Sequence, residues 1–229
     1  MGGHMQKKII ICVAVVVLLL LGVFTAYFYY DSKYVRFQDK IMKAQVLETL
    51  NSKKDKVLKT EAEEIEFLET FQMRETLTFE DLLALPNLKF VAVFGVRVAE
   101  ESEDYERYQN MIKDTFPQLN NLRKVFFHNN RSTYNLDAFS DCRQIEELWI
   151  QENHVKDIKG IEGMENLRIL VLRENPLTDI SPLEKLEKLE VVDFTGVSVK
   201  NIESLLKIPS LKLVYYTCLL YTSDAADEL

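Results

Sequence analysis

Apolar residues recur at fixed intervals over the C-terminal two thirds of the chain. The pattern LxxLxL, in which x is mostly polar, begins at Leu88, Leu122, Ile145, Leu167, Leu189 and Leu211. From Ile145 onward successive starts are evenly spaced, and the interval from Leu122 to Ile145 is longer by a single position. The much wider gap after Leu88 holds an acidic, helix-like insertion, Ala99 to Phe116. Each LxxLxL segment predicts a short strand with one buried face.

A second apolar pattern follows each predicted strand and completes the unit. In residues 167–188, the fullest example, Asn175 holds the ninth position, where its side chain can hydrogen-bond the backbone of a turn. The later leucines pack a returning helical segment. Because one unit cannot bury its own apolar face, the units must stack on one another. Val96 and Val197 replace the Asn in two units, so those turns need other backbone partners.

These units resemble leucine-rich repeats of the 22-residue type found in internalins and in the SDS22-like group. The resemblance covers about residues 77–217. It implies an α/β fold, a curved right-handed solenoid with short parallel strands on the concave face. In such proteins the outward-facing strand positions usually carry the function, whereas the repeated Leu, Ile and Asn residues form the scaffold.

A different apolar pattern marks the N-terminus. Residues 9–30 form an uncharged run that ends in an aromatic group, Tyr27 to Tyr30. As a helix, this run is long enough for the roughly 30 Å core of a bilayer, and its aromatic end suits the headgroup level. A cleaved signal peptide is the alternative, but the run exceeds a typical signal core and no small-x-small cleavage site follows. We therefore predict a transmembrane helix at 9–30 after a short basic N-terminus, residues 1–8.

The orientation of this helix depends on two opposing signals. Two lysines precede the helix and four basic residues follow it closely, which favours a cytoplasmic C-terminal side. A short basic segment before a long apolar core is, however, what the secretion machinery reads as a signal anchor. We expect a cell-membrane protein with one span and its repeats outside, on a bacterial surface.

Residues 31–76 join the predicted anchor to the repeats. The stretch Asp31 to Met73 is highly charged, lacks Pro and Gly, and has apolar residues at loose three-to-four spacing. It predicts a helical stalk that partly caps the first repeat, since a solenoid must cover its terminal core. A coiled-coil stalk is the alternative, although clean heptads are few.

The outward positions of the predicted strands form three columns that begin at Phe90, Ala92 and Phe94. These columns are unusually aromatic and aliphatic for a solvated face, and Trp, Tyr and Arg are common binding anchors. We predict a protein- or peptide-binding surface made of Phe126, Trp149, Lys124, Glu147, Arg173, Val171, Tyr215 and His128. In the alternative interpretation the insertion, the N-terminal helices or further repeats cover this face.

Charge, cysteine content and the absence of known motifs exclude several classes of function. The 28 Lys and Arg against 36 Asp and Glu give a net charge of −8, which argues against nucleic acid as a partner. Three scattered cysteines support neither a disulfide framework nor a zinc cluster. No nucleotide-binding, metalloprotease, hydrolase or EF-hand motif occurs. We therefore expect no catalytic residues, no cofactor and no metal.

Both ends of the chain contain residues that look foreign to the protein. Residues 218–228, CLLYTSDAADE, resemble the translated read-through of a sequencing-library adapter. We expect 218–229 to be a non-native tail and the natural repeats to continue beyond residue 217. At the other end Met5 competes with Met1 as the true start.

Together these features predict a membrane-anchored, non-catalytic leucine-rich-repeat protein that binds a protein or peptide. Two alternatives stay open. One is a cytoplasmic-side scaffold of the SDS22-like kind. The other is the presenting module of a longer receptor or enzyme whose C-terminal domain is missing.

Overall fold

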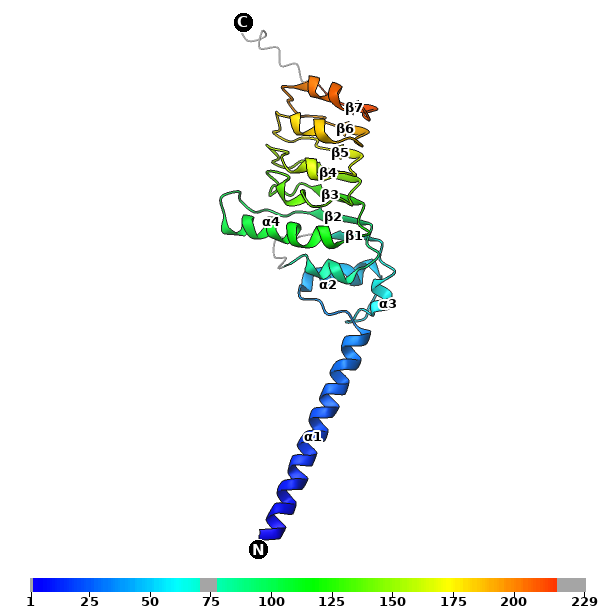
Figure 1. The fold of residues 1–229 in the computed structure, drawn as a ribbon, viewed down its shortest axis with the longest axis vertical. Coiled ribbons are helices and arrows are strands. Elements are labelled where there is room, and N and C mark those ends of the chain that lie inside the picture. Colours follow the sequence, from blue (N-terminus) through cyan, green and yellow to red (C-terminus); the bar gives the residue numbers. More distant parts are fainter. Residues whose placement is uncertain (1, 71–77, 218–229) are drawn as a thin grey trace, which may run out of the picture.

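The fold is a stack of parallel strands joined to a long N-terminal helix (Figure 1). The computed structural model describes residues 2–70 and 78–217, with side chains from Val16 onward. The predicted adapter-derived tail, 218–229, and Met1 lie outside the described residues.

Seven strands form one parallel sheet in chain order. They are β1 Phe67–Thr70, β2 Phe90–Phe94, β3 Lys124–His128, β4 Glu147–Gln151, β5 Ile169–Val171, β6 Val191–Asp193 and β7 Leu213–Tyr215. Equivalent positions of successive repeats lie side by side, as in the pairing of Phe126 with Trp149 and of Trp149 with Val171. The predicted solenoid of one strand per repeat is therefore confirmed.

The first strand, β1, lies inside the stretch for which the sequence predicted helix. Leu68 and Thr70 are buried while Phe67 and Glu69 are exposed, which is the alternation of a strand with one buried face. Together with Ile65 they repeat the LxxLxL pattern, except that a threonine holds the last apolar position. The Thr70 hydroxyl donates to the carbonyl of Ala92 at 3.0 Å, so a polar residue is tolerated in the core.

Helices α2 (Lys40–Thr49) and α3 (Lys59–Ala62) precede β1 and cap the solenoid. The Asp39 carboxylate accepts from the Ile41 N–H at 2.7 Å and so begins α2. The helix packs on β1 and buries Met42. The Asp81 carboxylate accepts from the Asp39 N–H at 2.7 Å and thereby ties the cap to the repeats. Burial raises the pKa of Asp81, and the hydrogen bonds that its carboxylate accepts from the Gln38 and Asp39 N–H groups partly offset the rise.

The returning segments of the repeats are short 3₁₀ helices on the side opposite the strands. They span Glu80–Ala84, Phe116–Gln118, Asp137–Phe139, Ile161–Gly163, Ser181–Lys185 and Ile202–Lys207. The predicted insertion forms helix α4 (Glu103–Thr115), which buries Tyr108 and Ile112. Its contacts are with these 3₁₀ helices, so α4 packs on the convex side of the solenoid (Figure 1).

Buried asparagines tie each turn to the turn before it. The Asn153 Oδ1 accepts from the Asn130 N–H at 3.2 Å, and its Nδ2 donates to the Phe127 carbonyl at 3.0 Å. Asn130 and Asn175 make equivalent bonds to their preceding repeats. The predicted role of these asparagines is thus confirmed. Asn130, Asn153 and Asn175 are together called the asparagine ladder. The ladder also provides a hydrogen-bond partner for the Val96 turn, because the Val96 N–H donates to the Asn130 Oδ1.

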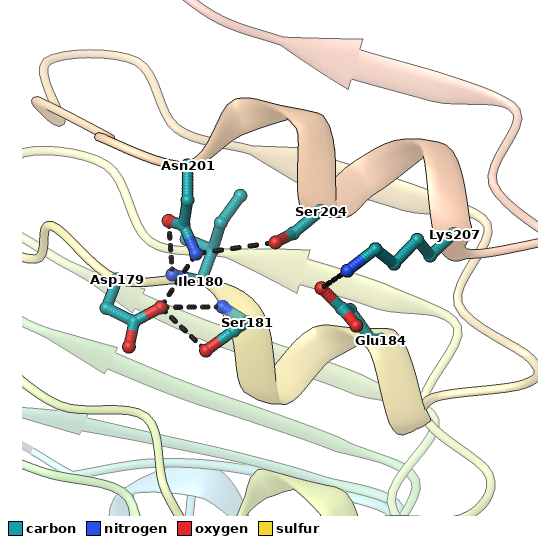
Figure 2. Close-up of polar contacts among 7 residues, drawn as sticks. All are labelled: Asp179, Ile180, Ser181, Glu184, Asn201, Ser204 and Lys207. Atoms are coloured by element: carbon teal, nitrogen blue, oxygen red, sulfur yellow. Dashed lines mark hydrogen bonds and ion pairs between the residues drawn. The ribbon is translucent and has the colours of Figure 1, made fainter.

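Polar side chains also connect the 3₁₀ helices of the last two repeats (Figure 2). The Asp179 Oδ1 accepts from the Ser181 N–H at 2.9 Å and from the Asn201 Nδ2 at 2.8 Å. These hydrogen bonds, with that of Ser181 the strongest, hold the pKa of Asp179 below its usual range. Lys207 donates to Glu184 at 2.8 Å and lowers the pKa of that carboxyl.

Helix α1 (Gly2–Lys33) contains the predicted membrane span and extends away from the cap (Figure 1). Its stretch Val16–Lys33 is long and apolar enough to cross a membrane, and none of it is buried within the protein.

Candidate functional site

The candidate site is the concave face of strands β1 to β4. Strands β3 and β4 alternate buried residues with partly exposed ones, and the partly exposed ones point away from the core. The in-register pairing brings Lys124 opposite Glu147, and His128 opposite Gln151. The sequence-predicted columns therefore exist as rows of neighbouring side chains.

Six aromatic rings run across this face and are named here the aromatic strip: Phe67, Phe90, Phe94, Phe126, His128 and Trp149. The ring centroids of Phe67 and Phe90 lie 4.6 Å apart, and those of Phe126 and Trp149 lie 6.2 Å apart. His128 stacks on Phe126 at 5.8 Å. These separations are those of contacting rings, so the strip consists of a Phe67–Phe90 pair and a group of four rings. The Lys124 ammonium joins the two groups, because it lies 5.5 Å from the Phe90 centroid and 4.6 Å from that of Trp149.

A charged pair fixes the orientation of Trp149 at the end of the strip. The Lys124 Nζ lies 3.0 Å from the Glu147 Oε2, and the Trp149 Nε1 donates to the same oxygen at 3.3 Å. The lysine ammonium also lies 4.6 Å from the centroid of the Trp149 ring. Because three groups hold each other, the indole is presented in a defined position at little cost in entropy on binding.

The predicted site residues Val171 and Arg173, which follow β4, are buried or paired rather than presented as free binding groups. Val171 holds an outward position, in register between Trp149 and Asp193, yet it is only 4% exposed. The Arg173 Nε lies 2.6 Å from the Oδ2 of Asp193, whose side chain is 5% exposed. The guanidinium thus neutralises a buried carboxylate, although about half of it still faces solvent.

Tyr215 lies apart from the aromatic strip. It is 48% exposed on β7, three strands from Trp149, a separation of about 14 Å at the usual strand spacing. The positions between them hold Val171 and Asp193, both buried. The structure therefore brings together Phe126, Trp149, Lys124, Glu147 and His128, and leaves Tyr215 separate.

Sequence reasoning assigned no binding role to Phe67, Phe90 and Phe94. Phe67 is 42% exposed and was missed because β1 was expected to be helix. Phe90 and Phe94 stood in the outward columns, and their adjacency to Phe67 and Phe126 becomes visible only in the folded sheet. The LxxLxL match beginning at Ile65 is the signal that could have revealed β1.

Groups that could support chemistry are sparse in the part of the chain that the structure describes. That part contains no cluster of three His, Cys, Asp or Glu side chains suited to a metal ion. Cys142 is fully buried, and burial raises the pKa of its thiol to about 12. A thiol in that state is a poor nucleophile at neutral pH.

Comparisons with known proteins agree with the repeat pattern. Residues 143–185 and 165–212 match the family described as leucine rich repeats in two copies. A comparison with curated proteins finds no match.

Several solved structures are similar to this chain. Internalin C2 of Listeria monocytogenes has a TM-score of 0.44 and 16% identity, covering 81% of this chain and 98% of that one. Another Listeria monocytogenes internalin has a TM-score of 0.41 and 19% identity, covering 80% and 65%. A leucine-rich-repeat protein of Leptospira interrogans has a TM-score of 0.49 and 17% identity, covering 69% and 44%. This chain thus spans less than two thirds of the last two.

Proposed function

We propose that this leucine-rich-repeat chain is a non-catalytic binding protein, held at a membrane by α1, that engages a protein or peptide through its concave face. The observation that carries the proposal is the aromatic strip, two groups of partly exposed rings on one sheet, joined by the Lys124 ammonium. Exposed apolar patches of this kind are interaction sites in soluble domains.

The strip has the properties of a binding hot spot. Aromatic side chains bury a large area for the loss of only two torsional freedoms each. Phe126 and Trp149 contact each other on its last two strands, β3 and β4, and the Lys124–Glu147 pair lies beside them. The rings supply affinity while the charged pair supplies register and specificity. The partner that fits is an extended segment with apolar side chains.

A peptide-display selection on the full chain tests this function. Peptides recovered against the wild type are titrated against Trp149→Ala and Phe126→Ala. Each substitution removes an aromatic anchor, so we expect affinity to fall by about 30-fold, the effect of a typical hot-spot residue. The control is Tyr134→Ala, which removes a half-buried ring outside the strip.

Two results would contradict the proposal. Equal loss of affinity in Tyr134→Ala would mean that the peptides do not use the strip. Thermal unfolding separates binding from folding: if Trp149→Ala and Phe126→Ala unfold the chain, these rings act as covered core rather than as a surface.

We further propose that α1 spans a cell membrane with the repeats outside. The apolar stretch Val16–Lys33 supports the span, and the short basic segment before it supports the orientation. The basic residues that follow α1 favour the opposite orientation, that of a cytoplasmic scaffold. Protease treatment of intact cells decides between them: repeats outside are digested, whereas repeats that survive until the cells are lysed place the domain in the cytoplasm.

A further inference from the structure

A second group of rings and cations, distinct from the aromatic strip, lies where α1 joins the cap. Tyr34 pairs with Leu58 through an antiparallel bridge, and the Val35 N–H donates to the Val57 carbonyl at 2.9 Å. This pairing places Lys56 beside the end of α1. The Lys33 and Lys56 ammonium groups lie 5.7 and 5.3 Å from the centroid of the Tyr34 ring.

These side chains line a pocket of about 390 Å³, here called the juxtamembrane pocket. Its lining residues are Lys33, Tyr34, Lys54, Asp55, Lys56 and Leu58. Two of its four charges are neutralised from outside the pocket: Lys54 pairs with Glu61 at 2.7 Å, and Asp55 pairs with Lys43 at 2.8 Å.

The other two charges, Lys33 and Lys56, are held by aromatic groups. The Lys33 Nζ donates to the Tyr29 hydroxyl at 3.2 Å, and the Lys56 Nζ lies 4.8 Å from the centroid of Tyr30. Among the described residues neither ammonium has a carboxylate within ion-pair distance. Both ammonium groups approach the Tyr34 ring and line the same pocket, so an anion bound there would meet two cations without an ion-pair partner among the described residues.

The position of the pocket indicates the source of the anion. Lys33 is the last residue of α1, so the pocket opens at the end of the apolar stretch Val16–Lys33. In a membrane-spanning helix this is the depth of the lipid headgroups, where Tyr and Lys side chains concentrate. Basic residues at that depth attract anionic lipids.

We propose that the juxtamembrane pocket binds the phosphate headgroup of an anionic phospholipid, with Lys33 and Lys56 as its ligands. This inference rests on the proposed membrane span of α1. The bound headgroup bridges the end of α1 and the segment that precedes α3, so it also fixes the domain relative to the bilayer.

Native mass spectrometry of the full chain in a neutral detergent tests the pocket. The probe is an equimolar mixture of phosphatidylglycerol and phosphatidylcholine with identical acyl chains. We expect at least fivefold preferential retention of phosphatidylglycerol, since each lysine near a lipid surface contributes about a fivefold effect. Lys33→Gln with Lys56→Gln should abolish the preference, whereas Lys33→Arg with Lys56→Arg should keep it.

Lys53→Gln is the matched control, because it removes one exposed charge next to the pocket without lining it. Equal retention of the two lipids, or a loss of preference in Lys53→Gln as large as in the double Gln variant, overturns the proposal. Displacement of the lipid by millimolar inorganic phosphate would identify a soluble-anion site and overturn the lipid assignment. Thermal unfolding confirms that each variant is folded.

A separate measurement isolates the anchor. The reconstituted chain is floated with neutral phosphatidylcholine vesicles after a carbonate wash. A chain that does not float refutes the membrane span itself. A chain that floats but shows no lipid preference refutes only the headgroup site.

Discussion

Asn153 connects three backbone groups from two repeats and is only 5% exposed. Its Oδ1 accepts from the Asn130 N–H at 3.2 Å, while its Nδ2 donates to the Phe127 and Gln151 carbonyls at 3.0 and 2.8 Å. The substitution Asn153→Ala removes all three bonds. Leaving a buried donor or acceptor unsatisfied costs about 1–3 kcal/mol for each group.

The expected loss of stability is smaller than the sum of the three penalties. The Gln151 carbonyl also accepts from the Asn129 N–H at 3.2 Å, so it keeps a partner in the variant. The Phe127 carbonyl lies within the paired β3–β4 ladder, so it too keeps a backbone neighbour. The Asn130 N–H is then the group left without its partner, and we expect a loss of about 1–3 kcal/mol. Asn153→Asp should also destabilise the chain, because a buried carboxylate accepts from Asn130 but faces the Phe127 and Gln151 carbonyls without a proton to donate.

Urea unfolding followed by tryptophan fluorescence measures this loss directly. The chain has a single tryptophan, and Trp149 lies on the strand that leads into the Asn153 turn. Asn110→Ala, an exposed position on α4, is the control and should change the stability by less than about 0.5 kcal/mol. A loss below about 1 kcal/mol for Asn153→Ala, or wild-type stability for Asn153→Asp, would refute the role assigned to the ladder.

Three further substitutions test the turns. Glu152 has a left-handed backbone with φ of 54°, so Glu152→Gly should stabilise the chain by about 0.5–1 kcal/mol, read as a higher Tm; an unchanged or lower Tm contradicts this. Gly163→Ala would press a Cβ onto the Ser140 carbonyl oxygen and should cost about 2 kcal/mol, whereas Gly22→Ala meets nothing within 4 Å and should unfold as wild type does. Hydrogen bonds lower the pKa of Asp179 in the folded chain. Its contribution to the stability of the fold is therefore present above the unfolded pKa near 3.8 and is lost as the pH falls through the folded pKa. Asp179→Ala should lower the urea midpoint more at pH 7 than at pH 3, and equal shifts at the two pH values would refute this prediction.

The sequence was sufficient to predict the scaffold because each repeat satisfies the same physical demand. An apolar residue at every second strand position and an Asn at the turn specify both the strand and its register. The pairing of Phe126 with Trp149 follows from the spacing of the two repeat starts alone. Register could therefore be predicted without any knowledge of side-chain packing.

The candidate site was less predictable because exposure depends on neighbours in the next repeat. Val171 stands in the same column as Trp149, yet only 4% of it is exposed in the folded sheet. Arg173 was predicted as a binding anchor from its residue type, and its partner, the buried Asp193, belongs to the following repeat. Phe67 was missed because Thr70 stands where the LxxLxL pattern has an apolar residue, so the first strand was not recognised.

The concave face is divided by these differences into two parts. The aromatic strip occupies β1 to β4, whereas the next two strands carry the Arg173–Asp193 pair and buried Val171. The four strands of the strip are also those nearest the cap and α1 (Figure 1). With about 4.8 Å between strands, the strip spans roughly 14 Å from the capped end of the solenoid. A partner that uses these rings would therefore contact the repeats nearest the cap and α1. If α1 spans a membrane as proposed, a headgroup bound between Lys33 and Lys56 would fix the angle at which the strip is presented.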